Sequence, residues 1–188
     1  MEFMRKLMFI GVVCCVFNVT ARADMFDFGG YLEYHNEVDY YYFSLPTSST
    51  SVEIWTDSYD NGAHFDPITA LWDGPTGNLI EQNDDNPGIR PADQTIYDSG
   101  ISLPSLTAGD YFLTITRYAN FASGTNIADG FAYDGQTPVP LLNCYGCYHL
   151  NLSYIDAPAP GPVVPLPGAF LLGMLGLGTA GIKLRKYS

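Results

Sequence analysis

The sequence predicts an all-β protein, a sandwich or barrel, flanked by an N-terminal signal helix and a C-terminal transmembrane helix. Hydrophobic residues make up 47% of the 188 residues, which is enough for one domain with a buried core. Between residues 24 and 156, short β-branched and aromatic runs alternate with Gly, Pro, Asn and Asp at intervals of about 8–12 residues. The two most apolar segments lie at the two ends of the chain.

Eight segments are predicted to be strands, because they are rich in β-branched and aromatic residues and are bounded by turn residues. They span residues 26–34, 39–45, 51–56, 68–73, 78–82, 100–103, 111–118 and 148–154. The last has the clearest alternation: every second position from Tyr148 to Tyr154 is apolar, and the positions between are polar. We therefore expect antiparallel sheets with one face on the core.

The chain is acidic, with 20 Asp and Glu against 8 Lys and Arg and a formal net charge of −12. Most of the cations lie beside the apolar ends. Between these ends, the chain has two basic residues, Arg90 and Arg117, and 19 acidic residues, so this part carries a formal charge of −17. A nucleic-acid-binding protein needs a basic surface, so that class is excluded. Aromatic residues make up 14% of the chain, more than a disordered acidic segment would carry.

The N-terminal 23 residues are predicted to be a secretory signal peptide. Arg5 and Lys6 form a positive start, and an apolar run covers residues 7–19. Ala21 and Ala23 then provide a small-x-small cleavage site. The apolar run is shorter than a membrane span needs. A buried N-terminal helix is the alternative, and a lipoprotein signal is another, although the two cysteines of the run lack the Leu-small-small triplet before them.

Residues 168–188 are predicted to form a transmembrane helix with a basic C-terminus. The uncharged run over residues 166–182 would be about 26 Å long as a helix, slightly short of a hydrocarbon core of about 30 Å. Because it is rich in Gly, it is marginal as a permanent anchor and adequate as a transient one. Lys183, Arg185 and Lys186 would hold this end in the cytoplasm, which places the acidic domain across the membrane.

A proline-rich linker over residues 157–167 joins the domain to this helix and favours an extended spacer. Its end carries a short motif formed by Val164, Pro165, Leu166, Pro167 and Gly168. Together with the apolar helix and the basic cluster, this motif resembles the C-terminal sorting signals of the PEP-CTERM class, in the Val-Pro-Leu-Pro variant. The resemblance implies recognition by a membrane-embedded exosortase, cleavage near the prolines, and transfer of the domain to the cell surface or the extracellular polymer matrix.

The central domain also resembles a known family. The run Asp39-Tyr40-Tyr41-Tyr42-Phe43-Ser44-Leu45 is similar to the early strand of bacterial pre-peptidase C-terminal domains. Further similar segments follow in order over residues 52–56, 65–73, 77–80, 83–85 and 106–113. The resemblance covers roughly residues 26–154 of the predicted 24–156 domain. It implies an antiparallel, jelly-roll-like β-sandwich that serves as an accessory, non-catalytic module, and it implies no particular substrate.

The strongest candidate for a metal site is a run of oxygen-bearing side chains. Asn83, Asp84 and Asp85 are followed by a further Asn, and Asp66 and Asp73 are their candidate partners. Such oxygens suit Ca²⁺, which would also relieve repulsion among the carboxylates of an acidic domain. The alternative, which we favour, is that these residues form turns and cap their own backbone. The spacing does not match an EF-hand loop.

Cys144 and Cys147 are the cysteines that remain once the signal peptide is removed. In an oxidising compartment a C-x-x-C pair is expected to form a disulfide, which stabilises little because its loop is short. Free thiols, a redox pair and a zinc site are the alternatives. A zinc site would need two further ligands; His149 is near in sequence, whereas His35 and His64 are far.

The sequence contains none of the common hydrolase or phosphate-binding motifs. We therefore expect an exported, non-enzymatic structural or binding module at the cell surface or in the extracellular matrix. Its expected partners are the membrane, an exosortase-type enzyme and an extracellular polysaccharide. The alternative is a secreted polysaccharide-active hydrolase with a carboxylate pair, or a carbohydrate-binding module that stacks sugars on exposed aromatic rings. The candidate rings belong to Tyr31, Tyr34, Tyr40, Tyr41, Tyr42, Trp55, Trp72 and Tyr118, and we favour their burial.

Overall fold

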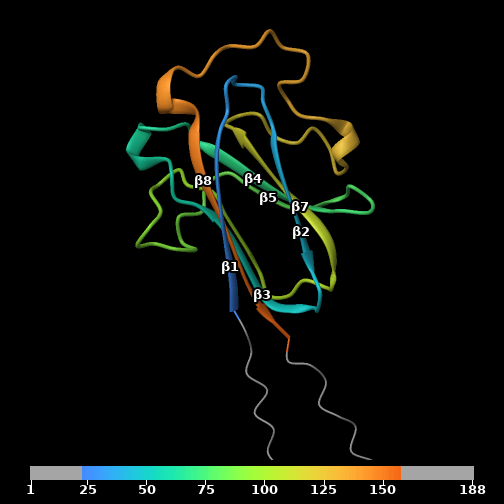
Figure 1. The fold of residues 1–188 in the computed structure, drawn as a ribbon. Helices are drawn as coiled ribbons and strands as arrows, with labels where there is room; N and C mark the ends of the chain where they lie inside the picture. The colour runs from blue at the N-terminus through green and yellow to red at the C-terminus, as the bar shows by residue number, and fades with distance from the viewer. Residues whose placement is uncertain (1–22, 158–188) are drawn as a thin grey trace, which may run out of the picture. The chain divides into compact units, whose positions relative to one another are not determined.

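The computed structural model describes residues 23–157 (Figure 1). The predicted signal peptide up to Arg22, the proline motif and the C-terminal helix lie outside these residues. Over residues 23–157, no helix has the length and apolar character to cross a membrane.

Eight strands make up the domain, and each corresponds to one of the predicted strands. They are β1 (Ala23–Tyr31), β2 (Asp39–Leu45), β3 (Ser49–Thr56), β4 (Pro67–Asp73), β5 (Leu79–Asn83), β6 (Gly100–Leu103), β7 (Gly109–Arg117) and β8 (Cys147–Asp156). Three short 3₁₀ turns lie between them, namely η1 (Asp60–Gly62), η2 (Ile127–Asp129) and η3 (Asn143–Gly146).

The predicted bounds agree within two residues for every strand except β1, which begins and ends three residues earlier than predicted. Hydrogen bonds that no sequence pattern reveals end this strand. The amide of Leu32, the first residue after β1, donates to the Gly146 carbonyl at 2.9 Å, and the Glu37 carboxylate accepts from the Tyr34 amide at 3.0 Å. Residues 32–34 therefore leave the β1–β8 pair: Tyr34 forms an isolated β-bridge with Pro140, and a turn follows at residues 35 and 36.

The strands form two four-stranded sheets with only antiparallel neighbours. The first sheet has the order β1-β8-β3-β6, and the second has the order β2-β7-β4-β5. Each strand of the first half of the chain therefore pairs with its counterpart from the second half: β1 with β8, β2 with β7, β3 with β6 and β4 with β5. This nested pairing is the jelly-roll arrangement of a sandwich.

The main core lies between the two sheets and is built by the alternating inward positions of the strands. Tyr148 spans this core: its hydroxyl bonds to the Tyr41 hydroxyl at 2.6 Å and to the Asp39 carboxylate, so that β8 is tied to β2 of the other sheet. The ring passes directly over Gly30, where a Cβ atom would lie 2.1 Å from the Tyr148 hydroxyl oxygen. Glycine is therefore required at that position of β1.

A second, smaller core covers the outer face of the second sheet. It consists of Ala70, Trp72, Phe112 and Phe131, of which Phe131 belongs to the loop that joins β7 to β8. The Trp72 indole donates its N–H to the Thr114 hydroxyl at 2.9 Å. As a result β7 is buried on both faces, not only on the inner one.

The two described ends of the domain leave it side by side. Ala23 lies opposite Ile155 in the β1–β8 pair, and the start of β1 and the end of β8 lie at the same end of the sandwich in Figure 1. The start of β4 lies at the opposite end, because the Phe65 amide donates to the Tyr145 carbonyl just before β8 begins. We call this the distal end of the domain.

Candidate metal centre

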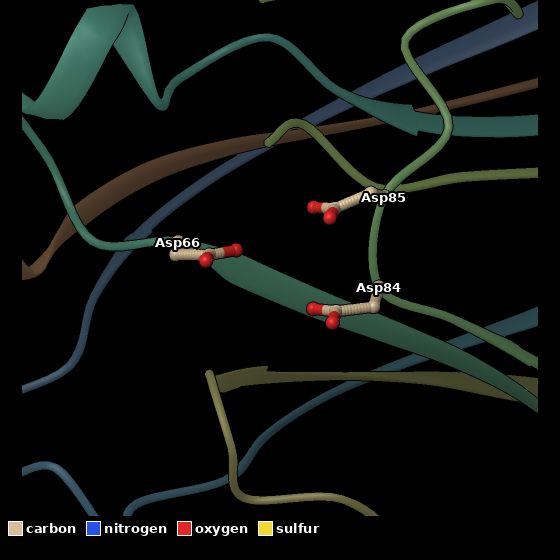
Figure 2. A group of neighbouring side chains, drawn as sticks. All are labelled: Asp66, Asp84 and Asp85. Carbon is tan, nitrogen blue, oxygen red and sulfur yellow. The ribbon is translucent and has the colours of Figure 1, made fainter. Parts of the chain in front are cut away.

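Asp66, Asp84 and Asp85 point their carboxylates toward one another at the distal end (Figure 2). One oxygen of each lies within 4.8 Å of the others. Asp66 immediately precedes β4, and Asp84 and Asp85 directly follow β5. Because β4 and β5 are antiparallel neighbours, the start of one and the end of the other lie at the same edge of the sheet. We call these three residues the aspartate triad.

Backbone hydrogen bonds hold Asp66 in this place. Its carbonyl accepts from the Tyr118 amide at 2.8 Å, just beyond the end of β7. The preceding Phe65 amide is bound to the loop before β8, and the following Pro67 begins β4. Three parts of the fold therefore fix the position of this carboxylate.

The triad is electrostatically unfavourable without a cation. Burial, followed by the charges of Asp84 and Asp85, raises the pKa of Asp66 to about 7, although Arg117 acts in the opposite direction. Burial and the Asp85 charge raise the pKa of Asp84 to about 6, and burial also raises the pKa of Asp85. These shifts show that the surroundings resist three negative charges at this place.

Two oxygens of the triad, Oδ1 of Asp66 and Oδ1 of Asp84, are buried and accept no hydrogen bond from the residues that the structure describes. Buried carboxylate oxygens normally have a partner, so both oxygens are available as ligands. A purely oxygen ligand set with several negative charges suits a hard cation such as Ca²⁺, which takes 6–8 oxygens and completes its shell with water. The triad therefore fits a calcium ion.

The other residues proposed for the metal site have other partners. Asn83 ends β5, and its side-chain oxygen accepts from the Gly100 amide at 2.8 Å. Asp73 lies at the other end of β4, where its carboxylate accepts from the Thr76 amide at 2.9 Å. Asp73 thus caps its own turn, as the alternative interpretation expects, whereas Asn83 bonds to the start of β6 in the other sheet.

Asp98, which the sequence analysis did not single out, organises the loops behind the triad. It is fully buried, and Oδ1 accepts hydrogen bonds from the Thr56 hydroxyl and the Ser58 and Tyr59 amides. Oδ2 accepts from the amide and hydroxyl of Thr95. No local pattern predicts the three donors to Oδ1, because they lie about 40 residues earlier in the chain.

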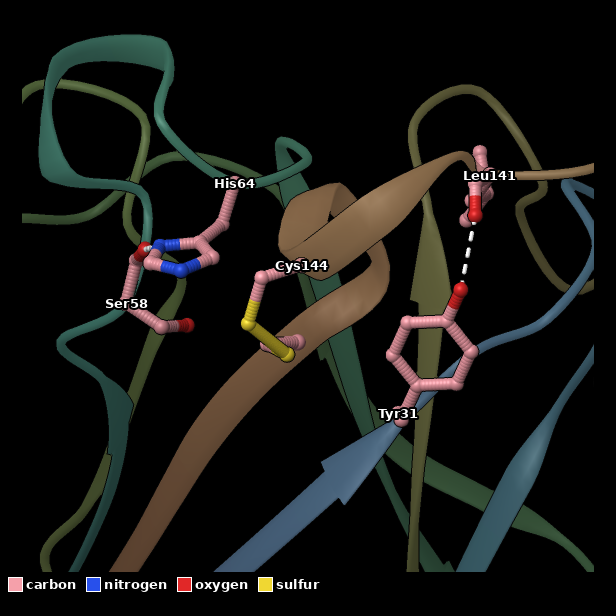
Figure 3. The surroundings of a disulfide bond; sticks show 6 residues. Tyr31, Ser58, His64, Leu141 and Cys144 are labelled. Carbon is pink, nitrogen blue, oxygen red and sulfur yellow. Dashed lines mark hydrogen bonds between the residues drawn. A yellow bond between two sulfur atoms is a disulfide. The ribbon is translucent and has the colours of Figure 1, made fainter.

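Cys144 and Cys147 form a disulfide that joins η3 to the start of β8 (Figure 3). Gly146 inside this loop is buried, and a Cβ atom there would lie 2.1 Å from the Leu32 carbonyl oxygen. The glycine thus allows the loop to approach the end of β1. Tyr31, at that end, donates its hydroxyl to the Leu141 carbonyl at 2.7 Å (Figure 3).

A pocket of about 540 Å³ lies beside the disulfide, and His64 and His149 both line it. The structure thus brings His64 close to the cysteine pair, although the two are far apart in sequence. Because the two sulfur atoms are bonded to each other, neither is available as a thiolate ligand for zinc. The His64 ring is bound to the Ser58 carbonyl at 2.6 Å (Figure 3).

The tryptophans among the candidate sugar-stacking rings are buried, as the favoured interpretation expects. Trp72 is inside the smaller core, and Trp55 lies beneath the Arg90 guanidinium, which is 4.8 Å from the ring centre. Four tyrosines remain substantially exposed, namely Tyr31, Tyr40, Tyr42 and Tyr118. Burial therefore accounts for part of this set only.

Part of the chain is similar to a known family. Residues 37–117, from just before β2 to the end of β7, match the family model of the bacterial pre-peptidase C-terminal domain. Among solved structures, the chain is similar to the pre-peptidase C-terminal domain of a collagenase from Bacillus anthracis, with 13% identity and a TM-score of 0.38. That similarity covers 68% of this chain and 85% of the other. No curated protein matches the chain.

Proposed function

We propose that the protein is an exported, non-enzymatic surface or matrix module whose distal end binds Ca²⁺. The aspartate triad carries the calcium proposal, because it combines three converging carboxylates with two buried oxygens that lack a partner. The similarity of residues 37–117 to the pre-peptidase C-terminal domain, a non-catalytic module of exported bacterial proteins, supports the accessory role.

The same proposal includes delivery by a PEP-CTERM-type sorting system. Residues 1–23 would direct export, and residues 168–188 would hold the precursor in the inner membrane until an exosortase-type enzyme cuts near the proline motif. Within the domain, the start of β1 and the end of β8 lie side by side, and the triad lies at the opposite end.

The calcium proposal is tested by thermal unfolding with calcium and with a chelator. At a calcium concentration about 100 times the dissociation constant, the unfolding midpoint should rise by roughly 10 °C. Asp84→Asn should abolish this rise, because it removes one charged ligand. Glu81→Gln is the matched control, since Glu81 is an exposed carboxylate on β5 outside the triad, and it should keep the rise. Equal midpoints in calcium and in chelator would refute the site.

The sorting proposal is tested by mapping the C-terminal peptides of protein recovered from cells. Cleavage near the proline motif should leave a domain without the peptide that spans residues 183–188. Recovery of that peptide still attached to the surface-exposed domain would mean that the helix is a permanent anchor. Hydrolysis of a panel of polysaccharides, lost on substitution of one acidic residue, would instead support the enzymatic alternative.

A further inference from the structure

A groove of about 390 Å³ lies on the outer face of the second sheet, at the end near the described chain ends. Tyr42 and Ser44 of the edge strand β2 line one side of it. Asp110 at the start of β7 and Pro75 in the turn after β4 line the other. The aspartate triad and the disulfide pocket lie at the distal end, so this groove is separate from both.

The register of the sheet places an aromatic row beside a polar row. Tyr42 lies opposite Phe112, and Phe112 lies opposite Trp72. One step nearer the chain ends, on the same face, Ser44 lies opposite Asp110. The two rows are therefore neighbours, and the groove lies where they meet.

Tyr42 supplies the exposed apolar surface of the groove. Its ring centre is 5.4 Å from that of Phe112, which holds the ring against the sheet, yet the residue is 74% exposed. The row continues across the sheet to β4, since the rings of Phe112 and Trp72 are parallel with centres 6.0 Å apart, whereas the Tyr42 ring is tilted by 38° to that of Phe112. The buried rings of Phe112 and Trp72 thus support the ring of Tyr42, which lies largely in solvent.

The polar row is held rigidly beside that ring. The Ser44 hydroxyl donates to Asp110 Oδ1 at 2.6 Å, and the Gly74 amide donates to the Asp110 carbonyl at 2.8 Å. A Cβ atom at Gly74 would lie 2.6 Å from that carbonyl oxygen, so only glycine lets the Gly74–Pro75 turn close against β7. The exposed Asp110 carboxylate is left as a hydrogen-bond acceptor at the groove.

This combination defines the ligand chemistry. A pyranose ring has an apolar C–H face, which packs on an aromatic ring, and an edge of hydroxyl donors, which suits a carboxylate acceptor. The ligand must also be uncharged or cationic, because the groove has no cationic side chain. Residues 23–157 carry a formal charge of −17, from two arginines and 19 acidic residues, and would repel a polyanion.

We propose that this groove binds the sugar rings of an uncharged polysaccharide, with Tyr42 as the stacking surface and Asp110 as the acceptor. The proposal deepens the proposed function, because a matrix module needs a surface that contacts the matrix. It concerns an end of the domain remote from the aspartate triad, so calcium binding and sugar binding can be tested independently.

Affinity electrophoresis of the full chain in a sugar-free non-ionic detergent tests the proposal. The gels contain a soluble cellulose derivative, a galactomannan, a starch-type glucan or, as the anionic comparison, alginate. We expect retardation in at least one uncharged polysaccharide and none in alginate. Tyr42→Ala should weaken the binding roughly tenfold, and Tyr42→Phe should retain most of it, because stacking needs the ring and not the hydroxyl.

Tyr118→Ala is the matched control, because Tyr118 is 48% exposed and lies beyond the opposite end of β7. It should leave the retardation unchanged. Equal mobility of the wild type in all gels, or equal retardation of Tyr42→Ala and the wild type, would overturn the proposal that this groove, which we call the sugar groove, binds sugar rings. Those results would leave export and calcium binding standing, since peptide mapping and the calcium-dependent unfolding midpoint measure these separately.

Discussion

At the scale of single residues, the aspartates of this domain differ in function because they differ in partners. Asp98 is fully buried and accepts hydrogen bonds both from Thr95 in its own loop and from Thr56 and Ser58 in a distant one, so its role is to hold the two loops together. Asp66 and Asp84 are partly buried, yet each keeps an oxygen without a donor from the described residues and faces other carboxylates. An identical side chain is therefore a structural group in one place and a candidate metal ligand in the other.

The triad predicts a dependence of stability on pH that has a definite sign. The folded-state pKa values, about 7 for Asp66 and about 6 for Asp84, exceed the ordinary value of 3.8. The protonated carboxyls are thus favoured in the folded protein, and this stabilisation is present below about pH 4 and lost as the pH rises through 6–7. In chelator, the thermal unfolding midpoint of the wild type should decrease, relative to that of Asp66→Asn, as the pH rises from 5 to 8.

Thermal unfolding of both proteins at several pH values measures this difference. Calcium should restore the wild-type midpoint at pH 8 and have little effect on Asp66→Asn. A difference between the two proteins that stays constant from pH 5 to 8 in chelator would show that the triad does not titrate in this range.

At the scale of the strands, β7 shows how a loop changes the environment of a sheet. The inward positions Tyr111, Leu113 and Ile115 belong to the main core, as their alternation predicts. The outward position Phe112 is also buried, because the loop between β7 and β8 places Phe131 over it and over Trp72. One part of the outer face of this sheet is therefore a core covered by the loop, and another part is the exposed groove.

Phe131→Ala should destabilise the domain by about 3 kcal/mol, because it opens a cavity over Trp72 in the smaller core. Phe121→Ala is the matched control in the same loop, since Phe121 is only half-buried and contacts Tyr118 at its edge. It should cost about 1 kcal/mol or less. Urea unfolding monitored by tryptophan fluorescence measures both, and equal losses would mean that the loop does not form a core of its own.

At the scale of the whole molecule, the two proposed binding sites lie at opposite ends of the domain, and the domain carries a large excess of negative charge. The described ends leave together at one end, next to the sugar groove, and the aspartate triad lies at the other. Nineteen acidic residues against two arginines make the domain strongly self-repelling. One of these arginines, Arg90, is paired with Glu53 at 2.7 Å.

Because of this repulsion, added monovalent salt should stabilise the domain by screening. We expect the unfolding midpoint in chelator to rise by several degrees between about 10 mM and 500 mM NaCl. Asp84→Asn should show nearly the same rise, since it removes one of many charges, whereas its response to calcium should be absent. A midpoint that is independent of NaCl would show that the acidic residues are too far apart to destabilise the fold.

The strands, the alternation of β8 and the cysteine pair could be predicted from the sequence, because each depends on residues close together in the chain. The backbone of a strand turns successive side chains to opposite faces, so a local pattern reports a local structure. The oxygen-rich run after β5 could be recognised for the same reason.

Three features became visible only in the folded chain: the role of Asp98, the burial of Phe112, and the meeting of Tyr42 and Ser44 with Phe112 and Asp110. All three depend on the register between strands and on loops that cross from one sheet to the other. An outward position of a strand can be exposed, covered by a loop or part of a groove. Contacts between segments about 20 to 70 residues apart decide which, and no periodicity within a single strand encodes them.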